Sequence, residues 1–166
     1  FISKWAKVLI RHTERNYDKA AKRHLPTKAI LVIDEILPEF NKDSGSQRMM
    51  HLLTIFKELN YQTIFVPNNG YLTEPYYSIL RNLGIQIISN RFGEAIRKMT
   101  ILKLAPQIHI AWMSRPRINR KFQYVIRYNK KIKWIYDTID LHFVRHRREA
   151  EIPGTSLVPR EELLRR

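Results

Sequence analysis

The amino-acid sequence predicts an α/β protein whose core is one open parallel sheet with helices on both faces. Three observations lead to this prediction: short continuous apolar runs recur along the chain, amphipathic helical patterns separate them, and the two kinds of segment alternate. A continuous apolar run is typical of a strand that is covered on both sides. Five such runs alternating with four helical patterns indicate βαβ units, and thus a Rossmann-like sheet of about five strands.

The elements follow one another along the middle of the chain. Strands are predicted at 29–33, 62–66, 85–88, 107–113 and 133–136, and helices at about 46–59, 74–83, 92–104 and 117–130. The first helix has Met49, Leu52, Leu53, Phe56 and Leu59 on one face, and the second has Tyr77, Leu80 and Leu83 at steps of three. We expect the strands to take a flavodoxin-like order.

Four ring-bearing side chains in the predicted strands are expected to belong to the core. His109 lies within an apolar run, so it is interpreted as a core histidine with satisfied hydrogen bonds. Trp112, Trp134 and Tyr136 are likewise interpreted as core residues, not as platforms for a ligand.

Length and composition limit the class of protein. The 166 residues, 44% of them hydrophobic, suit one globular domain with a sizeable core. There is no cysteine, which excludes disulfides and thiolate sites and fits a reducing, cytoplasmic setting. No run approaches the roughly 20 apolar residues of a membrane-spanning helix, and no signal peptide is recognisable. Because the first residue is Phe1, the chain is expected to be a piece of a longer protein.

We divide the chain into three parts. Residues 1–28 are predicted to be a basic helical arm or linker, which either packs one apolar stripe on the domain or lies on a membrane surface. Residues 29–151 form the Rossmann-like domain. Residues 152–166 have the composition of a loop, and their LVPR matches a protease-tag cleavage sequence, so they are expected to be a linker or an added tail.

The net charge of +15 is distributed unevenly along the chain. Residues 91–133 carry 12 basic and 1 acidic side chains, whereas residues 34–90 carry 4 basic and 6 acidic ones. A basic region of this kind attracts any polyanion, including lipid headgroups, nucleotide diphosphates and RNA. The aromatic residues lie in the strand and helix patterns instead of between the exposed basic runs, which argues against a nucleic-acid stacking platform.

The segments that follow the predicted strands are polar and suit a binding site. In a doubly wound sheet the carboxyl ends of the strands border one crevice, where ligands bind. Those ends offer Asn68 and Asn69 after the second strand, Ser114 and Arg115 after the fourth, and Asp137 after the fifth. These five residues are predicted to form the rim of a cleft.

The sequence DSGSQR, which precedes the first helix, has two interpretations of equal weight. Ser44, Gly45 and Ser46 would place hydroxyl and N–H groups at the positive end of a helix, which suits a phosphate. Alternatively, Asp43, Ser44 or Ser46 is an ordinary N-cap, worth about 1 kcal/mol. The motif is neither a Walker loop nor GxGxxG.

The sequence DTIDLH, which follows the last strand, brings together two carboxylates and an imidazole. Asp140 and His142 are candidates for acid-base work, with Asp137 beside them. No metal site is predicted, because two lone carboxylates more often cap helices or pair with arginines. His142 and His146 have the spacing of a zincin motif, but Phe143 stands where that motif needs glutamate.

The chain resembles the N-terminal half of a group 1 glycosyltransferase of the GT-B fold, over about residues 29–151. The resemblance rests on ILVIDEILPEFNKDSGSQRM, LGIQII, the SRP of WMSRP, and YDTIDLHFVRHRREAE. Members have a D-x-D-S-G-S-x-R-like loop after the first strand and D-T-x-D-L-H-F after a late strand. This chain departs from the pattern in having only one acid, Asp43, just before its SGS.

The resemblance implies a specific function. Such enzymes have two Rossmann-like domains with the active site between them; the N-terminal one binds a glycan or lipid-linked acceptor, and the C-terminal one binds most of the nucleotide-sugar donor. It further implies no metal and no cofactor besides the nucleotide-sugar, and inactivity without the C-terminal domain. His142 and Asp140 would be catalytic. The loop residues Asp43, Ser44, Gly45, Ser46 and Arg48 would face the donor phosphates.

A second hypothesis from another class remains open. The chain would then be a basic module that binds an anionic membrane or a nucleic acid and catalyses nothing. A salt-sensitive affinity for nucleic acids of mixed sequence would favour it.

Overall fold

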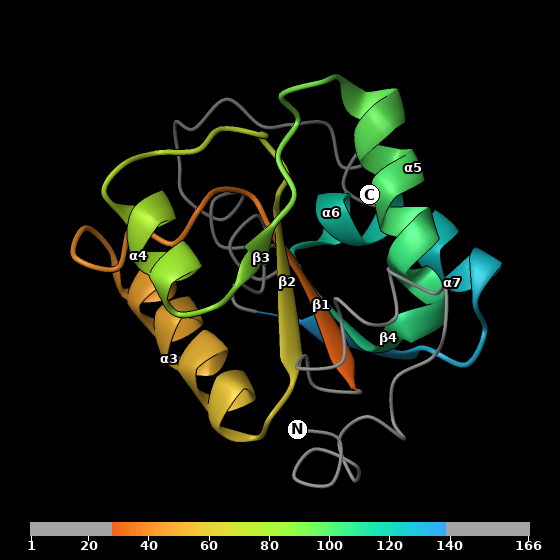
Figure 1. The fold of residues 1–166 in the computed structure, drawn as a ribbon, viewed down its shortest axis with the longest axis horizontal. Helices are drawn as coiled ribbons and strands as arrows, with labels where there is room; N and C mark the ends of the chain where they lie inside the picture. Colours follow the sequence, from red (N-terminus) through yellow and green to blue (C-terminus); the bar gives the residue numbers. More distant parts are fainter. Residues whose placement is uncertain (1–27, 139–166) are drawn as a thin grey trace, which may run out of the picture.

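The computed structural model describes residues 28–138, and within them strands and helices alternate as the sequence predicts (Figure 1). The strands are β1 (Ala29–Asp34), β2 (Gln62–Pro67), β3 (Gln86–Ile87), β4 (Ile108–Ser114) and β5 (Lys133–Asp137). The helices are α3 (Ser44–Glu58), α4 (Tyr76–Asn82), α5 (Glu94–Leu104), α6 (Pro116–Lys121) and α7 (Tyr124–Tyr128), with the 3-10 turn η1 (Ala105–Gln107) before β4. The predicted arm and tail, together with Asp140 and His142, lie outside the described residues.

All five strands pair in parallel, which confirms the α/β class and the open Rossmann-like sheet. Their order is β3-β2-β1-β4-β5, so the predicted flavodoxin-like order is wrong. The difference lies in which strand stands at the edge. β3 has only two residues and exposes Gln86, as suits an edge strand, whereas β2 is buried along most of its length.

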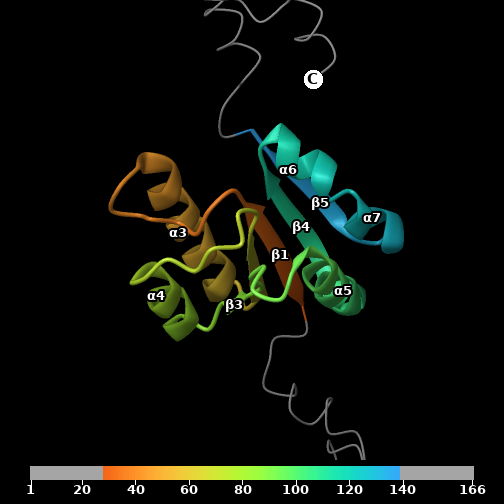
Figure 2. The ribbon, with the colours of Figure 1, turned by 90° about the horizontal axis from the view of Figure 1, so that it is seen from above.

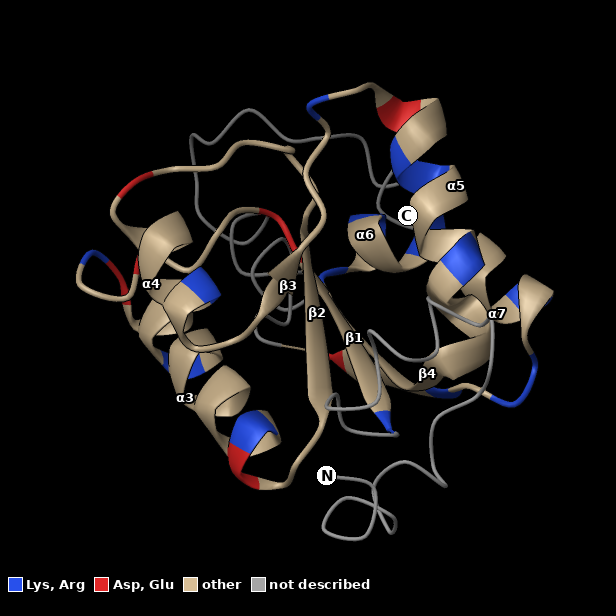
Figure 3. Ribbon diagram, in the orientation of Figure 1, with Lys and Arg blue, Asp and Glu red and all other residues tan. Residues whose placement is uncertain are grey.

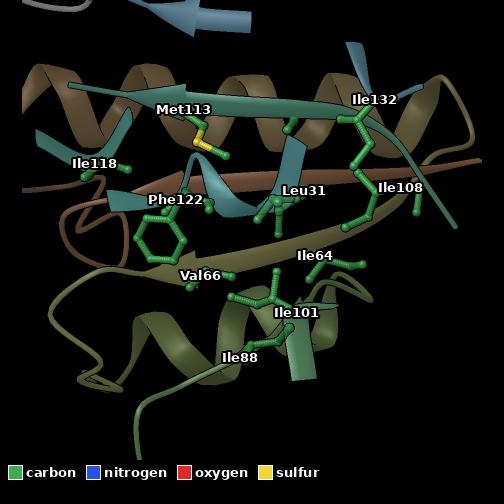
Figure 4. Close-up of a cluster of buried hydrophobic side chains, with 14 residues drawn as sticks. Leu31, Ile64, Val66, Ile88, Ile101, Ile108, Met113, Ile118, Phe122 and Ile132 are labelled. Atoms are coloured by element: carbon green, nitrogen blue, oxygen red, sulfur yellow. The ribbon is translucent and has the colours of Figure 1, made fainter. Parts of the chain in front are cut away.

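Alternate side chains of the central strands point to opposite faces of the sheet, so both faces are buried. Leu31 and Ile33 of β1 belong to a cluster that includes Ile101 of α5 and Phe122, which follows α6 (Figure 4). Ile30 and Val32 belong to a second cluster with Met49, Leu53 and Phe56 of α3. A continuous apolar strand such as β1 therefore contributes side chains to both core clusters.

The helices form two layers, one on each side of the sheet. Viewed from above, α3 and α4 lie on one side of the strands, and α5, α6 and α7 lie on the other (Figure 2). The predicted helix at 117–130 is divided into α6 and α7, because the chain tightens at Phe122, whose carbonyl accepts the Val125 N–H at 3.0 Å in a bond of the 3-10 type. In the described part of the chain, no helix has both the length and the apolar character needed to cross a membrane.

Two of the expected core residues are exposed. Ala29 pairs with Ile108 and Ile30 pairs with Ile110, so His109 between them has no partner in the register. This irregularity directs the histidine outward, and its ring nitrogen Nδ1 lies 2.9 Å from the Gln107 carbonyl oxygen. Tyr136 is 39% exposed, because β5 is an edge strand. The interpretation of both as core residues is wrong, whereas Trp112 and Trp134 are partly buried against the two clusters.

Candidate functional site

The carboxyl ends of four strands bring the predicted rim residues to one edge of the sheet. Asp34 ends β1, Asn68 follows β2, Ser114 ends β4 and Asp137 ends β5. β1 and β4 are neighbours in the sheet. From β1 the strand order continues to β2 and β3 in one direction, and from β4 it continues to β5 in the opposite direction. This is the point at which strand order reverses, where doubly wound proteins bind ligands.

The first turn of α3 is capped by Asp43. One carboxylate oxygen, Oδ1, accepts the Ser46 N–H at 2.7 Å, and the other accepts the Ser46 hydroxyl at 2.7 Å. The Ser46 hydroxyl, and then its N–H, hold the pKa of Asp43 below the usual value. The backbone carbonyl of Asp43 accepts the Gln47 N–H at 3.0 Å. Asp43 is thus the N-cap of α3.

This cap agrees with the second interpretation of the DSGSQR sequence, an ordinary N-cap, and the role of the loop toward a phosphate stays a prediction. The N–H groups of Ser46 and Gln47 at the start of α3 are both bonded to Asp43. Gly45 lies within α3, and its Cβ position would be 3.2 Å from the Asp43 carboxylate oxygen. The glycine therefore gives room to the capping carboxylate and is not needed for a left-handed backbone. An anion at this helix end would have to displace Asp43.

Arg48 joins the first helix to the last strand. Its guanidinium donates two hydrogen bonds to the Asp137 carboxylate, at 2.7 and 3.1 Å. Trp112 donates a third from its indole nitrogen at 2.9 Å. The Asp137 side chain is 8% exposed and that of Arg48 is 46% exposed. Asp137 is therefore a buried carboxylate with its negative charge neutralised, and Trp112, expected only as a core residue, is one of its partners.

Asp34 and Arg115 meet where the strand order reverses. The Arg115 side chain donates to the Asp34 carboxylate at 3.3 Å, and that carboxylate also accepts the Glu35 N–H at 2.7 Å. Burial raises the pKa of Asp34, although the Glu35 N–H and the Arg115 charge oppose this. Arg115 has a φ of +74°, which is rare for a residue with a side chain. Beside it, the buried Ser114 hydroxyl has no hydrogen-bond partner within residues 28–138.

Asn68 is the centre of a second polar cluster at the same edge. Its amide nitrogen donates to Glu35 at 3.0 Å, and its amide oxygen accepts from Lys121 at 2.9 Å. Glu35 also contacts Arg117 at 3.3 Å. Asn69 instead supports the loop, because its N–H donates to the Glu35 carbonyl at 3.0 Å and its side chain accepts the Tyr71 N–H at 3.1 Å.

Arg97 of α5 contacts this cluster from the interior of the domain. Its side chain is 1% exposed and forms an ion pair with Glu94. The guanidinium donates to the carbonyls of Pro67 and Asn68, at 2.9 and 3.1 Å. A buried cation on α5 thus stabilises the segment after β2. Arg97 lies on the inner face of α5 with Ile101, and sequence reasoning missed it because one more basic residue in an amphipathic helix gives no local signal of burial.

The charged groups of this edge are largely paired with one another. Arg115 and Arg117 have side chains that are 44% and 82% exposed, and each contacts its acid at 3.3 Å, a longer distance than the 2.7 Å between Arg48 and Asp137. Long and partly exposed ion pairs are weak, so both guanidinium groups can exchange their carboxylates for an anionic ligand. Within the described ranges no cluster of three or more acidic or histidine side chains could hold a metal ion.

The structure brings together most of the predicted rim residues and adds others to them. Asn68, Arg115, Ser114 and Asp137 lie along one edge as predicted. The residues that sequence reasoning missed are Asp34, Glu35, Arg97, Arg117 and Lys121. Asp140 and His142 lie beyond Thr138, outside the described residues, so their predicted roles stay predictions.

Comparison of the chain with models of known families, with curated proteins and with solved structures finds no match.

Proposed function

We propose that this chain is the N-terminal, acceptor-side domain of a GT-B glycosyltransferase. The enzyme would transfer a sugar from a nucleotide-sugar to a glycan or lipid-linked acceptor, in polysaccharide or cell-envelope biosynthesis of a bacterium. The domain would work with a C-terminal domain that binds most of the donor, and it would be inactive without it. No metal or cofactor is needed in this proposal, and the protein would act in the cytoplasm or at the cytoplasmic face of the membrane.

One contact supports the proposal more than any other. Arg48, from the SGSQR motif, pairs with Asp137, the first residue of the DTIDLHF motif, across 89 positions of sequence. The two motifs that carry the family resemblance are thus bonded to each other at the ligand-binding edge of a Rossmann-like sheet. Parallel pairing brings both segments to this edge, and the direct pairing of one motif with the other is the observation that supports the proposal.

The geometry suggests a division of roles. Arg48 and Asp137 neutralise each other and hold the two motifs in register, so we assign them a positioning role. Arg115 and Arg117 are exposed cations of this edge whose ion pairs are long, and they would contact the donor diphosphate. His142 and Asp140, which follow Asp137 by five and three residues, would contact the transferred sugar or the acceptor.

The proposal is tested on the intact protein that carries this domain. Transfer of label from radioactive nucleotide-sugars to a membrane or glycan acceptor is measured for the wild type and for His142→Ala. We expect the substitution to lower transfer by about 10²–10⁴ if the imidazole does acid-base or electrostatic work. His51→Ala, at an exposed position of α3, is the matched control and should retain full activity.

A second variant tests the loop. Gly45→Val places bulk against the Asp43 carboxylate, because even a Cβ at this position lies 3.2 Å from it. We expect a strong loss of transfer with a modest fall in thermal stability. Full turnover in both variants, or no binding of any nucleoside diphosphate by the intact protein, would contradict the proposal.

A further inference from the structure

The outward face of α5 carries an exposed apolar stripe. Phe92, Ile96 and Met99 are 71%, 46% and 50% exposed, and Lys103 continues the series. Ile96, Met99 and Lys103 have spacings of three and four residues, which put their side chains on one face of α5, and Phe92 lies in the turn before Gly93, the N-cap of the helix. The opposite face of α5 is the one that faces the core, through Arg97 and Ile101. Folding of the described domain does not require the stripe to be apolar.

Cations lie near this stripe, and one of them, Lys98, lies on another side of α5 with its ammonium nitrogen 5.1 Å from the centre of the Tyr124 ring. The Arg91 guanidinium lies over the Phe92 ring at 5.6 Å, and Lys98 and Lys103 are exposed on the same helix. The segment from residue 91 to residue 133, which contains α5, α6 and α7, has 12 basic side chains and one acid, Glu94. Figure 3 shows Lys and Arg on all three helices and on the loop that leads to β5. Glu94 itself is paired with Arg97.

We propose that the layer formed by α5, α6 and α7 docks on an anionic lipid surface. Phe92, Ile96 and Met99 would enter the boundary between headgroups and acyl chains, and Arg91, Lys98 and Lys103 would contact headgroup phosphates. An apolar stripe flanked by cations is the pattern by which a helix lies in a membrane interface. Charge complementarity with the surface supplies the remaining attraction.

Two other occupants fit the surface less well. A nucleic acid would use the cations and aromatic rings, but it offers little to the aliphatic Ile96 and Met99. A second copy of the chain would bring two strongly basic surfaces together, and like charges oppose such a contact. The inference goes beyond glycosyl transfer and holds whether or not the protein transfers a sugar.

The first experiment measures binding of the full chain to vesicles by co-sedimentation. We expect binding to vesicles that contain phosphatidylglycerol, weaker binding to pure phosphatidylcholine, and a decrease as salt rises. Ile96→Ser with Met99→Ser should reduce binding about tenfold, since each side chain would lose partial burial in the interface. Lys98→Gln with Lys103→Gln should reduce it about 30-fold, from about 1 kcal/mol for each cation.

The control lies on the other layer. Ile55 and Leu59 are 45% and 63% exposed at α3, so Ile55→Ser with Leu59→Ser matches the stripe variant in chemistry and exposure. We expect this variant to bind as the wild type does. Equal binding of the stripe and control variants, or no binding of the wild type to anionic vesicles, would overturn the proposal. Salt-sensitive binding to duplex RNA without vesicle binding would overturn it in favour of a nucleic-acid surface.

A second measurement reports membrane contact directly and does not require a variant with weaker binding. Because the chain has no cysteine, Met99→Cys carries one environment-sensitive fluorophore at a single site, and Ile55→Cys provides the matched label on α3. On anionic vesicles we expect a blue shift and brighter emission at position 99 and no change at position 55. Equal changes at both positions, or none at position 99 when the protein is bound, would refute the orientation.

Discussion

On one face of the sheet lies α3, a helix of 15 residues whose first turn is capped by the Asp43 side chain. On the other face lies α5, with 11 residues, whose N-cap is Gly93 and has no side-chain hydrogen bond. Both helices cover apolar strands that are fully buried. Their buried polar side chains differ: α3 buries the small Ser46 in its first turn, whereas α5 places the cation Arg97 in the interior.

The outer surfaces of the two layers differ more than the inner ones. The segment with α3 and α4 has 4 basic and 6 acidic side chains between residues 34 and 90, a net charge of −2. The segment with α5, α6 and α7 has 12 and 1 between residues 91 and 133, a net charge of +11. Packing against a sheet constrains only the inner face of a helix, so the packing of the domain does not require this difference in charge.

The largest expected effect comes from removing the buried cation. Arg97→Ala leaves the carbonyls of Pro67 and Asn68 without their donor and breaks the pair with Glu94. We expect a loss of about 3–5 kcal/mol in the free energy of unfolding, measured by urea denaturation. Arg81→Ala, at an exposed position of α4, is the control and should change stability by less than about 0.5 kcal/mol. Similar values for both variants would show that Arg97 is not the support of the α5 layer.

Cavities in the two cores should lower the free energy of unfolding by similar amounts. Leu53 of α3 and Ile101 of α5 are both 0% exposed and belong to different clusters. We expect Leu53→Ala and Ile101→Ala each to lower the free energy of unfolding by about 3 kcal/mol, from lost burial and the cavity left behind. A difference larger than about 2 kcal/mol between them, seen in the same denaturation assay, would mean that one layer is packed more loosely than the other.

The glycines at the two helix starts should respond differently to alanine. Gly93 has a φ of +92°, so Gly93→Ala would strain the backbone although a Cβ meets nothing within 4 Å. We expect a loss of about 1–2 kcal/mol in stability. Gly45 is helical, so Gly45→Ala gains helix propensity and is opposed only by the 3.2 Å contact with Asp43, giving a change near zero. Thermal unfolding of both variants measures the difference, and an equal loss would contradict it.

The smallest expected effect is a pH dependence. The pKa of Asp43 is lowered in the folded protein, so its contribution to stability is present above the unfolded pKa of about 3.9 and is lost as pH falls through the lower, folded value. Asp43→Asn keeps a capping oxygen and removes this titration. Urea denaturation between pH 2 and 6 should therefore show a shallower acid loss in the variant. An unchanged pH profile would mean that the carboxylate is not the cap in solution.

Much of the fold was predictable because its signals are local. The apolar run at 29–33 indicates a strand buried on both faces, and its residues do alternate between the two clusters. The helix at 46–59 was visible from the period of Met49, Leu53 and Phe56, all three of which are buried. Asp43 was one of the caps considered, because aspartate before a helical pattern is a common N-cap.

The candidate site was predictable only in part. That Asn68, Ser114, Arg115 and Asp137 lie along one edge follows from parallel pairing alone, once the strands are identified. The partners of these residues do not follow, because a hydrogen bond between Arg48 and Asp137 joins positions 89 residues apart. Trp112 lies in an apolar stretch of sequence, which predicts only burial. The hydrogen bond from its indole N–H to Asp137 forms because β4 pairs with β5.

By itself, the sequence determined the α/β class, the positions of the strands and the charge difference between the two segments, since each depends on residues close together in the chain. It offered three candidates for the cap of α3, and the structure selects Asp43. The tertiary structure decided the order β3-β2-β1-β4-β5, the exposure of His109 at a register shift, and the buried role of Arg97. Strand order and buried ion pairs depend on which distant segments meet. That choice is made by the free energy of the whole packed domain, not by any local pattern.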